Sequence, residues 1–242
     1  MPSRPADWRS HSNGAPSAVN TATADSTISG PIPSPGISVA GIDCGIDWLL
    51  SGEECDKDTR GEIITPDEII AATRRWLERS VIGLNLCPFA ESVYRGARVR
   101  FFVSEQRTAQ ALLQEFRVES QALQAADPLR CETTLLIHPW VLADFIEYND
   151  FLEVCIAAIA ELGLEGELQV ASFHPQYQFA GTQSEDIENY TNRSPYPMLH
   201  LLREASIERA VAAVPDTDEI YRRNIRTLRE LGHAGWRRLW RD

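Results

Sequence analysis

The chain has 242 residues, of which 43% are hydrophobic and 24% charged, so it is long enough for one domain, or two small ones, with an ordinary hydrophobic core. Its formal net charge of -12 removes the phosphate counterion release that general nucleic-acid binding needs, and an anionic membrane surface repels it. No apolar stretch has the length of a transmembrane helix and the N-terminus lacks the apolar core of a secretory signal, so we expect a cytoplasmic protein that binds neither nucleic acid nor membrane. The five cysteines are odd in number and form no CxxC pair, so disulfides and a paired-cysteine zinc site are not expected.

Residues 1–60 differ in composition from the rest of the chain. They are rich in Ser, Pro, Gly, Ala and Thr and show no sustained hydrophobic period, so they cannot bury enough apolar surface to offset the entropy lost on folding. We therefore expect a disordered tail over 1–60, one α/β domain over 61–235, and a basic, aromatic C-terminal tail over 236–242.

The first helix of the domain is predicted from a start signal, the sequence TPDE. Thr65 is a suitable N-cap, proline is favoured in the first turn, and Glu68 completes a capping box. Apolar residues then recur at helical spacing as far as Leu84, and Pro88 stops the helix.

Strands and helices alternate after this helix. The patterns predict a strand over 98–103, a helix over 109–127, a short buried strand over 133–137, a long helix over 140–162 and a strand over 167–173. A long polar and aromatic loop then leads to a helix predicted over 197–214, and Asp216 caps a final helix that ends at Leu231-Gly232.

This order of elements favours an α/β fold, with a small, mainly parallel central sheet flanked by helices. Ligands of such sheets usually bind beyond the carboxyl ends of the strands. His138 and His174 each follow a predicted strand directly, and each precedes a proline. If the two strands are parallel, both histidines lie on the same rim of the sheet.

The loop that begins at His174 is the strongest candidate for a site, because compact domains seldom keep a loop of this length without function or disorder. His174 is the candidate acid/base, since histidine is the usual general base near neutral pH. Tyr177 and Asn192 are candidate binding residues in the same loop, and His138 is one on the same rim. The alternative for each histidine is structural: the ring caps the strand end and bonds a neighbouring carbonyl.

Cys87 is the candidate nucleophile, paired with His174. A helix C-terminus does not lower the pKa of a thiol, so the alternative is a small buried hydrophobic side chain. Together with His138, these two residues also form a mixed sulfur and nitrogen set suited to zinc or iron, and a Cys-Pro dipeptide can ligate haem.

An anion site is predicted where the sequence NYTNRSPYP leads into the helix over 197–214. A helix N-terminus offers free N–H groups and partial positive charge, Arg193 lies beside it, and His200 and Arg203 follow on one helical face. Such a site can hold a carboxylate or phosphate, so a small anionic molecule is the candidate partner. The alternative is that Ser194 caps the helix and Arg193 pairs with an acidic neighbour.

Five long motifs stand out in the folded region: LNLCPFA, TTLLIHP, DFIEYNDFLE, LEGELQVASFHPQYQFAGT and NYTNRSPYPMLHLLREASIERAV. Together they resemble a bacterial protein family defined only as a domain of unknown function, over a region from about Thr65 to His233. The resemblance implies a bacterial-type cytoplasmic protein, and it supplies no activity, cofactor or catalytic residue.

The sequence thus supports three hypotheses for the function. The first is a small-molecule enzyme that binds an anionic substrate at the rim, with His174 as acid/base, Cys87 as nucleophile or second polar group, and Arg193 and Arg203 holding the anion. The second is a metal- or haem-binding protein that uses Cys87, His138 and His174. The third is a non-catalytic protein-interaction module.

Overall fold

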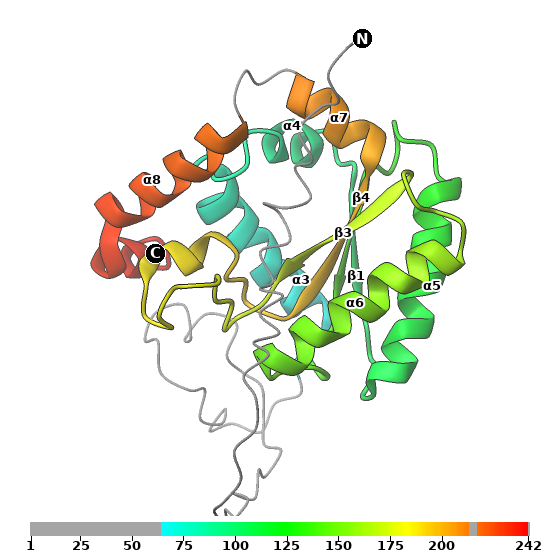
Figure 1. The fold of residues 1–242 in the computed structure, drawn as a ribbon. Coiled ribbons are helices and arrows are strands. Elements are labelled where there is room, and N and C mark those ends of the chain that lie inside the picture. The colour runs from blue at the N-terminus through cyan, green and yellow to red at the C-terminus, as the bar shows by residue number, and fades with distance from the viewer. Residues whose placement is uncertain (1–63, 213–216, 242) are drawn as a thin grey trace, which may run out of the picture.

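The computed structural model describes residues 64–212 and 217–241. In that part of the chain a four-stranded sheet lies between helices, as Figure 1 shows. The elements in chain order are α3 (Pro66–Trp76), η1 (Leu77–Ile82), α4 (Ala90–Arg95), β1 (Val99–Val103), α5 (Ala109–Ala125), β2 (Thr133–Ile137), α6 (Phe145–Glu161), β3 (Leu168–Phe173), η2 (Ile187–Thr191), β4 (Met198–Arg203), α7 (Glu204–Ala212) and α8 (Thr217–Arg238). The tail predicted over 1–60 and the cap predicted at Asp216 lie outside the described residues. No helix in the described ranges is both long and apolar enough to cross a membrane.

The predicted α/β class is confirmed, and so is the start of the first helix. Thr65 Oγ1 accepts a hydrogen bond from the N–H of Glu68 at 3.4 Å, and the Glu68 carboxylate accepts one from the N–H of Thr65 at 2.8 Å. This reciprocal pair is the capping box that the sequence predicts. The helix continues as the π-helical turn η1 and ends at Ile82, before Pro88.

The sheet is mixed, and the prediction of a mainly parallel sheet is wrong. The strand order is β1-β2-β4-β3, in which β1 and β2 pair in parallel while β4 runs antiparallel to both of its neighbours. The strands β1, β2 and β3 still point the same way, because β2 and β3 are each antiparallel to β4. The error comes from one strand that the sequence pattern did not reveal.

That strand is β4, where the sequence pattern predicts the helix over 197–214. The segment MLHLLR forms a strand instead, and α7 follows it from Glu204. Met198, Leu199 and Leu201 are fully buried although they point to both faces of the sheet. A central strand covered on both faces has apolar side chains without strict alternation, so its pattern resembles that of a buried helix.

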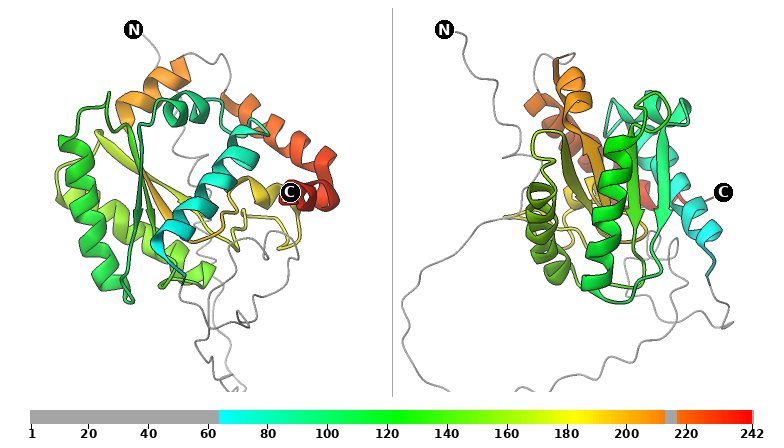
Figure 2. Two further views of the ribbon diagram at one scale, coloured as in Figure 1. Left: turned by 180° about the vertical axis from the view of Figure 1, so that it is seen from behind. Right: turned by 90° about the vertical axis from the view of Figure 1, so that its right-hand side faces the viewer.

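The two faces of the sheet have different covers. On one face α5 and α6 pack over the strands, and Leu136, Leu199 and Leu201 are fully buried beneath them. On the other face α3 lies over β1, as the cyan helix in the two views of Figure 2 shows, and η1 continues α3. The helix α8 lies further out on that side and packs chiefly against η2.

Two helix ends differ from the sequence expectation for local reasons. The helix α6 begins at Phe145 and not near Trp140, because Asp144 is its N-cap and accepts hydrogen bonds from the next turn. The helix α8 bends at Gly232, whose φ of 60° is left-handed, and then continues to Arg238.

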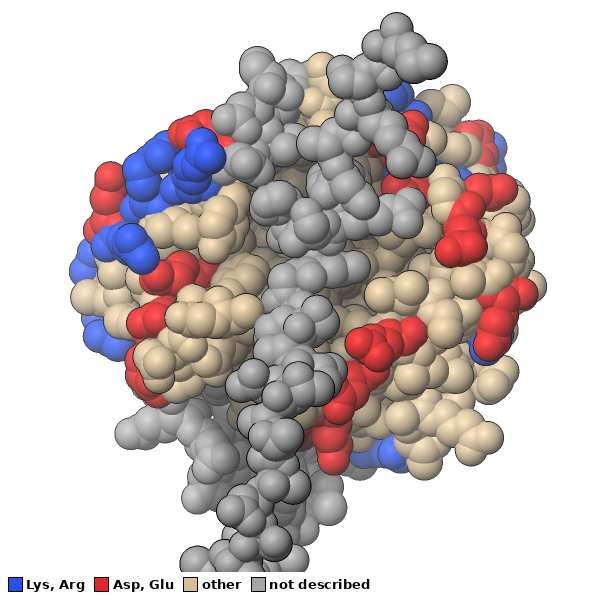
Figure 3. Space-filling model, viewed as in Figure 1, with Lys and Arg blue, Asp and Glu red and all other residues tan. Residues whose placement is uncertain are grey.

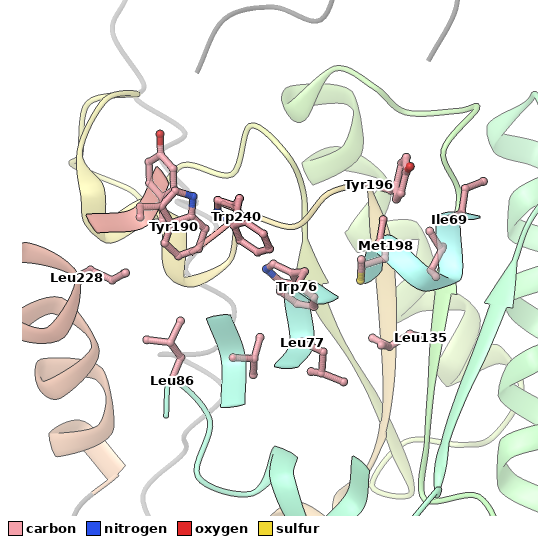
Figure 4. Packing of buried hydrophobic residues seen from close by; sticks show 14 of the residues in the cluster. Ile69, Trp76, Leu77, Leu86, Leu135, Tyr190, Tyr196, Met198, Leu228 and Trp240 are labelled. Carbon is pink, nitrogen blue, oxygen red and sulfur yellow. The ribbon is translucent and has the colours of Figure 1, made fainter. Parts of the chain in front are cut away.

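The C-terminal residues are part of the core. Trp236 and Trp240 are buried, and Trp236 makes edge contacts with the rings of Trp240 and Tyr190. In Figure 4 the indole of Trp240 lies between Tyr190 and Trp76. The aromatic residues predicted for the tail over 236–242 therefore help to hold α8 against the rest of the domain.

Candidate functional site

The two strand-end histidines lie on one rim, as the topology of β2 and β3 requires. The N–H of His138 donates to the carbonyl of Pro197 at 3.0 Å, and the N–H of His174 donates to the carbonyl of Asn192 at 3.2 Å. The ring of Tyr148, from α6, lies 5.8 Å from the His138 ring and 4.9 Å from the His174 ring, measured between centroids. The structure thus brings the two histidines together around one buried tyrosine.

Both imidazoles are closed to solvent and fixed by backbone groups. His138 is fully buried, and its Nδ1 lies 3.0 Å from the carbonyl oxygen of Val141. His174 is also fully buried, with Nε2 3.2 Å from the carbonyl oxygen of Leu142 and Nδ1 accepting from the N–H of Gln176 at 3.0 Å. A carbonyl can only accept, so His138 carries its proton on Nδ1 and His174 carries its proton on Nε2.

Burial decides the charge of these rings. It lowers the pKa of His138 and of His174 to about 4, so both are neutral at pH 7. Both ring nitrogens of His174 are already bonded to the backbone, which leaves none for a substrate. These contacts tie the start of the long loop to α6 and to the turn before it.

The loop after His174 is held by side chains that the sequence analysis took for binding residues. Asn192 Nδ2 donates to the carbonyl of Ser172 at 3.1 Å, and the buried Tyr177 hydroxyl bonds Ser172 and Asn192, while burial raises the pKa of Tyr177. Asn189, which the sequence analysis missed, is fully buried at the centre of the loop. Its Oδ1 accepts from the N–H of Phe179 at 3.0 Å, and its Nδ2 donates to the carbonyl of Gln183 at 2.7 Å.

The two arginines predicted to hold an anion bond backbone carbonyls instead. Arg193 is buried, donates to the carbonyls of Tyr177 and Ser184 at 3.1 and 2.5 Å, and stacks over the ring of Tyr190. Arg203 donates to the carbonyls of Ala126 and Cys131 at 2.7 and 3.3 Å and so caps the end of α5. The predicted helix N-terminus between them is absent, because residues 198–203 form β4. The structure does not bring the two guanidinium groups together.

Cys87 lies in the other core cluster, on the α3 side of the sheet, whereas His138 and His174 contact Tyr148 on the α6 side. Burial raises the pKa of the Cys87 thiol, which favours the unreactive protonated form. In the described ranges, no group of three or more His, Cys, Asp or Glu side chains is placed to hold a metal ion. The proposed set of Cys87, His138 and His174 is therefore not assembled.

His200 is the predicted binding residue whose position the strand changes most. It lies in the middle of β4, where its Nε2 is 2.7 Å from Oγ1 of Thr133. Thr133 Oγ1 in turn donates to the carbonyl of Leu201 at 2.5 Å, so it must accept from His200 Nε2. The proton of His200 is therefore on Nε2, and Nδ1 is an acceptor for which no protein partner is seen in the described residues.

The sheet face around His200 is covered at one end and open at the other. Ile137 and Met198 are fully buried at the covered end. His200, its neighbour Ala171 on β3, and Leu202 are only half-buried toward the open end, although they lie on or beside a central strand. The apolar side chains on the opposite face of the same strand are fully buried. The partial exposure of His200 therefore comes from the elements that pack on its face, and not from its position in the sheet.

His200 lies on this half-buried part of the sheet face. Its side chain keeps some contact with solvent, yet the protein encloses it enough for burial to lower its pKa to about 4. The ring of Phe173 lies 5.9 Å from the His200 ring, and the ring of Trp76 meets Phe173 edge-on at 5.2 Å. We call this part of the sheet face the His200 site. It consists of Ala171, His200 and Leu202, with the ring of Phe173 beside His200 and the buried ring of Trp76 behind Phe173.

The sequence signals for the His200 site were weak. Assigning residues 198–203 to a helix put His200 on one face with Arg203, whereas in a strand residues three apart point to opposite faces. Ala171 could not be recognised from the sequence as a neighbour of His200, because that pairing depends on the register of β3 and β4. Only the alternation of Met198, His200 and Leu202 against more deeply buried neighbours distinguishes this face, and sequence alone does not show burial.

Comparison with known proteins agrees with the motif-level resemblance and adds no activity to it. The chain matches no curated protein and no solved structure. One family model matches residues 68–238, which cover nearly all of the described fold from α3 to the end of α8. The chain therefore belongs to the family described as Protein of unknown function (DUF1415).

Proposed function

We propose that this protein binds a small, largely apolar or aromatic molecule at the His200 site, and that Nδ1 of His200 accepts a hydrogen bond from it. The single observation that carries this proposal is an oriented imidazole with an open acceptor on a half-buried apolar sheet face. A site with an apolar lining and few fixed polar groups is the usual form of a small-molecule site.

The chemistry follows from the groups that surround His200. Thr133 fixes the ring by accepting from Nε2 and donating to the backbone, so Nδ1 points in one direction without a cost in ring entropy. The pKa of about 4 keeps the ring neutral at pH 7, which favours a hydrogen-bond acceptor over a general base tuned to neutral pH. Phe173 offers an aromatic ring beside it, and Ala171, paired with His200 across β3 and β4, adds only a methyl group to this face.

This proposal keeps the small-molecule hypothesis and moves its site from the rim to the sheet face. The ligand is expected to be a neutral hydrogen-bond donor, because Arg193 bonds loop carbonyls and Arg203, three residues from His200 on β4, points to the opposite face of the sheet. We also propose a cytoplasmic location. It is supported by the three described cysteines, Cys87, Cys131 and Cys155, which are all free thiols as in reducing compartments.

The test is a fragment screen by NMR on isotope-labelled full-length protein. We expect aromatic fragments that carry one N–H or O–H donor to shift the methyl resonances of Leu135, Ala171 and Leu202. His200→Leu keeps the size of the side chain and removes the acceptor, so it should weaken those fragments about tenfold, the worth of one enclosed hydrogen bond.

His233→Leu is the matched control, since His233 is exposed and lies on α8. It should leave every fragment affinity unchanged. The proposal fails if the fragments that bind shift resonances elsewhere, or if wild type and His200→Leu, both with folded spectra, bind them equally well.

A further inference from the structure

We infer that the outer face of α6 docks an amphipathic helix of another protein whose apolar residues are flanked by Arg or Lys. The α6 face consists of Ile146, Glu147, Asp150, Glu153, Val154, Ile156 and Ala157, all of them exposed. It lies on the side of the sheet opposite the His200 site, so this inference does not depend on the ligand proposed there.

The first observation is apolar surface where a helix should be polar. Ile146, Val154 and Ile156 are 66%, 44% and 46% exposed, and Val118 on the neighbouring helix α5 is 61% exposed. A single exposed apolar residue is ordinary on a soluble protein. Three of them lie on the exposed side of α6 and the fourth lies on the neighbouring helix α5, and no described residue covers them.

The second observation is a one-sided charge. The segment 139–192 contains no Lys or Arg, and its ten acidic residues are Asp144, Glu147, Asp150, Glu153, Glu161, Glu165, Glu167, Glu185, Asp186 and Glu188. Figure 3 shows red side chains set among tan ones on the side of the molecule where α6 lies, whereas the blue side chains gather over α8.

The acidic side chains on the α6 face also lack ion pairs. No basic side chain of the described residues pairs with Glu147, Asp150 or Glu153, whereas Glu91 and Glu219, elsewhere on the surface, each pair with an arginine. Unpaired carboxylates beside exposed apolar groups attract a surface that carries both features in complementary form.

The neighbouring helix adds surface without opposing charge. The exposed side chains of α5 are uncharged: Gln110, Gln114, Val118, Gln121, Ala122, Gln124 and Ala125. Arg117, at its contact with α6, is already paired with Glu161. A basic partner would therefore meet neutral and acidic groups across both helices.

The spacing of the residues on the α6 face fits a helical partner. Ile146 and Val154 are eight residues apart, and Asp150 lies midway between them on the same side of the helix. A partner helix with apolar residues at helical spacing and basic residues on their flanks matches this order. A second copy of this chain matches it less well, because the arginines of α8 include Arg226 and Arg229, which already pair with Glu219 and Glu188.

The test uses two synthetic peptides of equal length that form amphipathic helices with leucine on one face. One carries Arg and Lys on the flanks of that face, and the other carries Glu at the same positions. Fluorescence anisotropy with full-length protein should show binding of the basic peptide at low salt, weakened at least tenfold by raised salt, and no binding of the acidic peptide.

Two variants separate docking from general attraction to an acidic protein. Replacing Glu147, Asp150 and Glu153 by their amides should weaken the basic peptide about tenfold. The control, with Glu165, Glu167 and Glu185 all changed to Gln, removes the same charge away from the face and should change the affinity by less than about twofold. Val154→Ser should weaken binding without changing the net charge.

The inference is overturned if the two triple variants behave alike, or if Val154→Ser binds as wild type does. Analytical ultracentrifugation tests the other possible partner of the α6 face, which is a second copy of this chain. Self-association that Val154→Ser abolishes would assign the α6 face to a second copy of this chain and would contradict a separate partner.

Discussion

Lowering the pH from 7 to 5 is expected to reduce the free energy of unfolding by about 4 kcal/mol through His138 and His174 alone. Burial lowers the pKa of each ring to about 4, whereas an unfolded histidine titrates near 6.5. Below pH 6.5 the unfolded chain therefore binds protons that the folded chain does not. The stabilisation is complete above pH 6.5 and is lost as the pH falls toward 4, and His200 acts in the same direction.

Urea unfolding at pH values from 7.5 to 5.0 measures this slope. His138→Asn and His174→Gln retain an N–H donor near the original position and remove the titration, so each should reduce the mean slope between pH 7 and pH 5 by about 1 kcal/mol per pH unit. His233→Gln, at an exposed site, is the control. Equal slopes for wild type and both buried variants would show that these rings titrate normally in the folded protein.

The second large effect is expected for Tyr148→Phe, which should destabilise the protein by about 2–4 kcal/mol. The hydroxyl of Tyr148 donates to the carbonyl of Met198 at 2.8 Å and accepts from the N–H of Phe173 at 3.0 Å. Those two residues face each other where β3 and β4 pair. Without the hydroxyl, a buried donor and a buried acceptor lose their partner while the ring contacts with both histidines remain.

Chemical denaturation at pH 7.5 measures the loss, and amide hydrogen exchange locates it, since the N–H of Phe173 should exchange faster. Tyr221→Phe is the matched control because Tyr221 is 49% exposed, and it should change stability by less than about 0.5 kcal/mol. A Tyr148→Phe variant as stable as this control would mean that the hydroxyl does not tie β3 and β4 to α6.

Local signals in the sequence were sufficient for most elements. Some features depend only on neighbours along the chain, so the sequence displays them directly. They are the capping box at Thr65, the short apolar run of β2 and the N-cap Asp144 of α6. The segment of β4 carries apolar residues on both sides, so period alone cannot separate a central strand from a buried helix. Because this segment is a strand and not a helix, the sheet is mixed and not mainly parallel.

The candidate site shows a similar division. The sequence placed His138 and His174 on one rim correctly, because chain direction and strand order determine the rim. It could not show that Tyr148 lies between them or that Leu142 and Gln176 occupy both nitrogens of His174, because those contacts depend on how α6 packs on the sheet. Conversely, the open acceptor of His200 appears only when β4 is a strand.

The central claim is that His200 presents an unpartnered imidazole nitrogen on a half-buried sheet face. His138, whose Nε2 also lacks a partner, and His174 are both enclosed in the core. Long-range proton–nitrogen NMR of the imidazoles at pH 7 tests it in one measurement, because it reports the protonated nitrogen of each ring. We predict neutral rings with the proton on Nδ1 in His138 and on Nε2 in both His174 and His200, and a shift on fragment binding at Nδ1 of His200 only. A protonated or exchanging His174, or a fragment-induced shift at its nitrogens, would contradict the account.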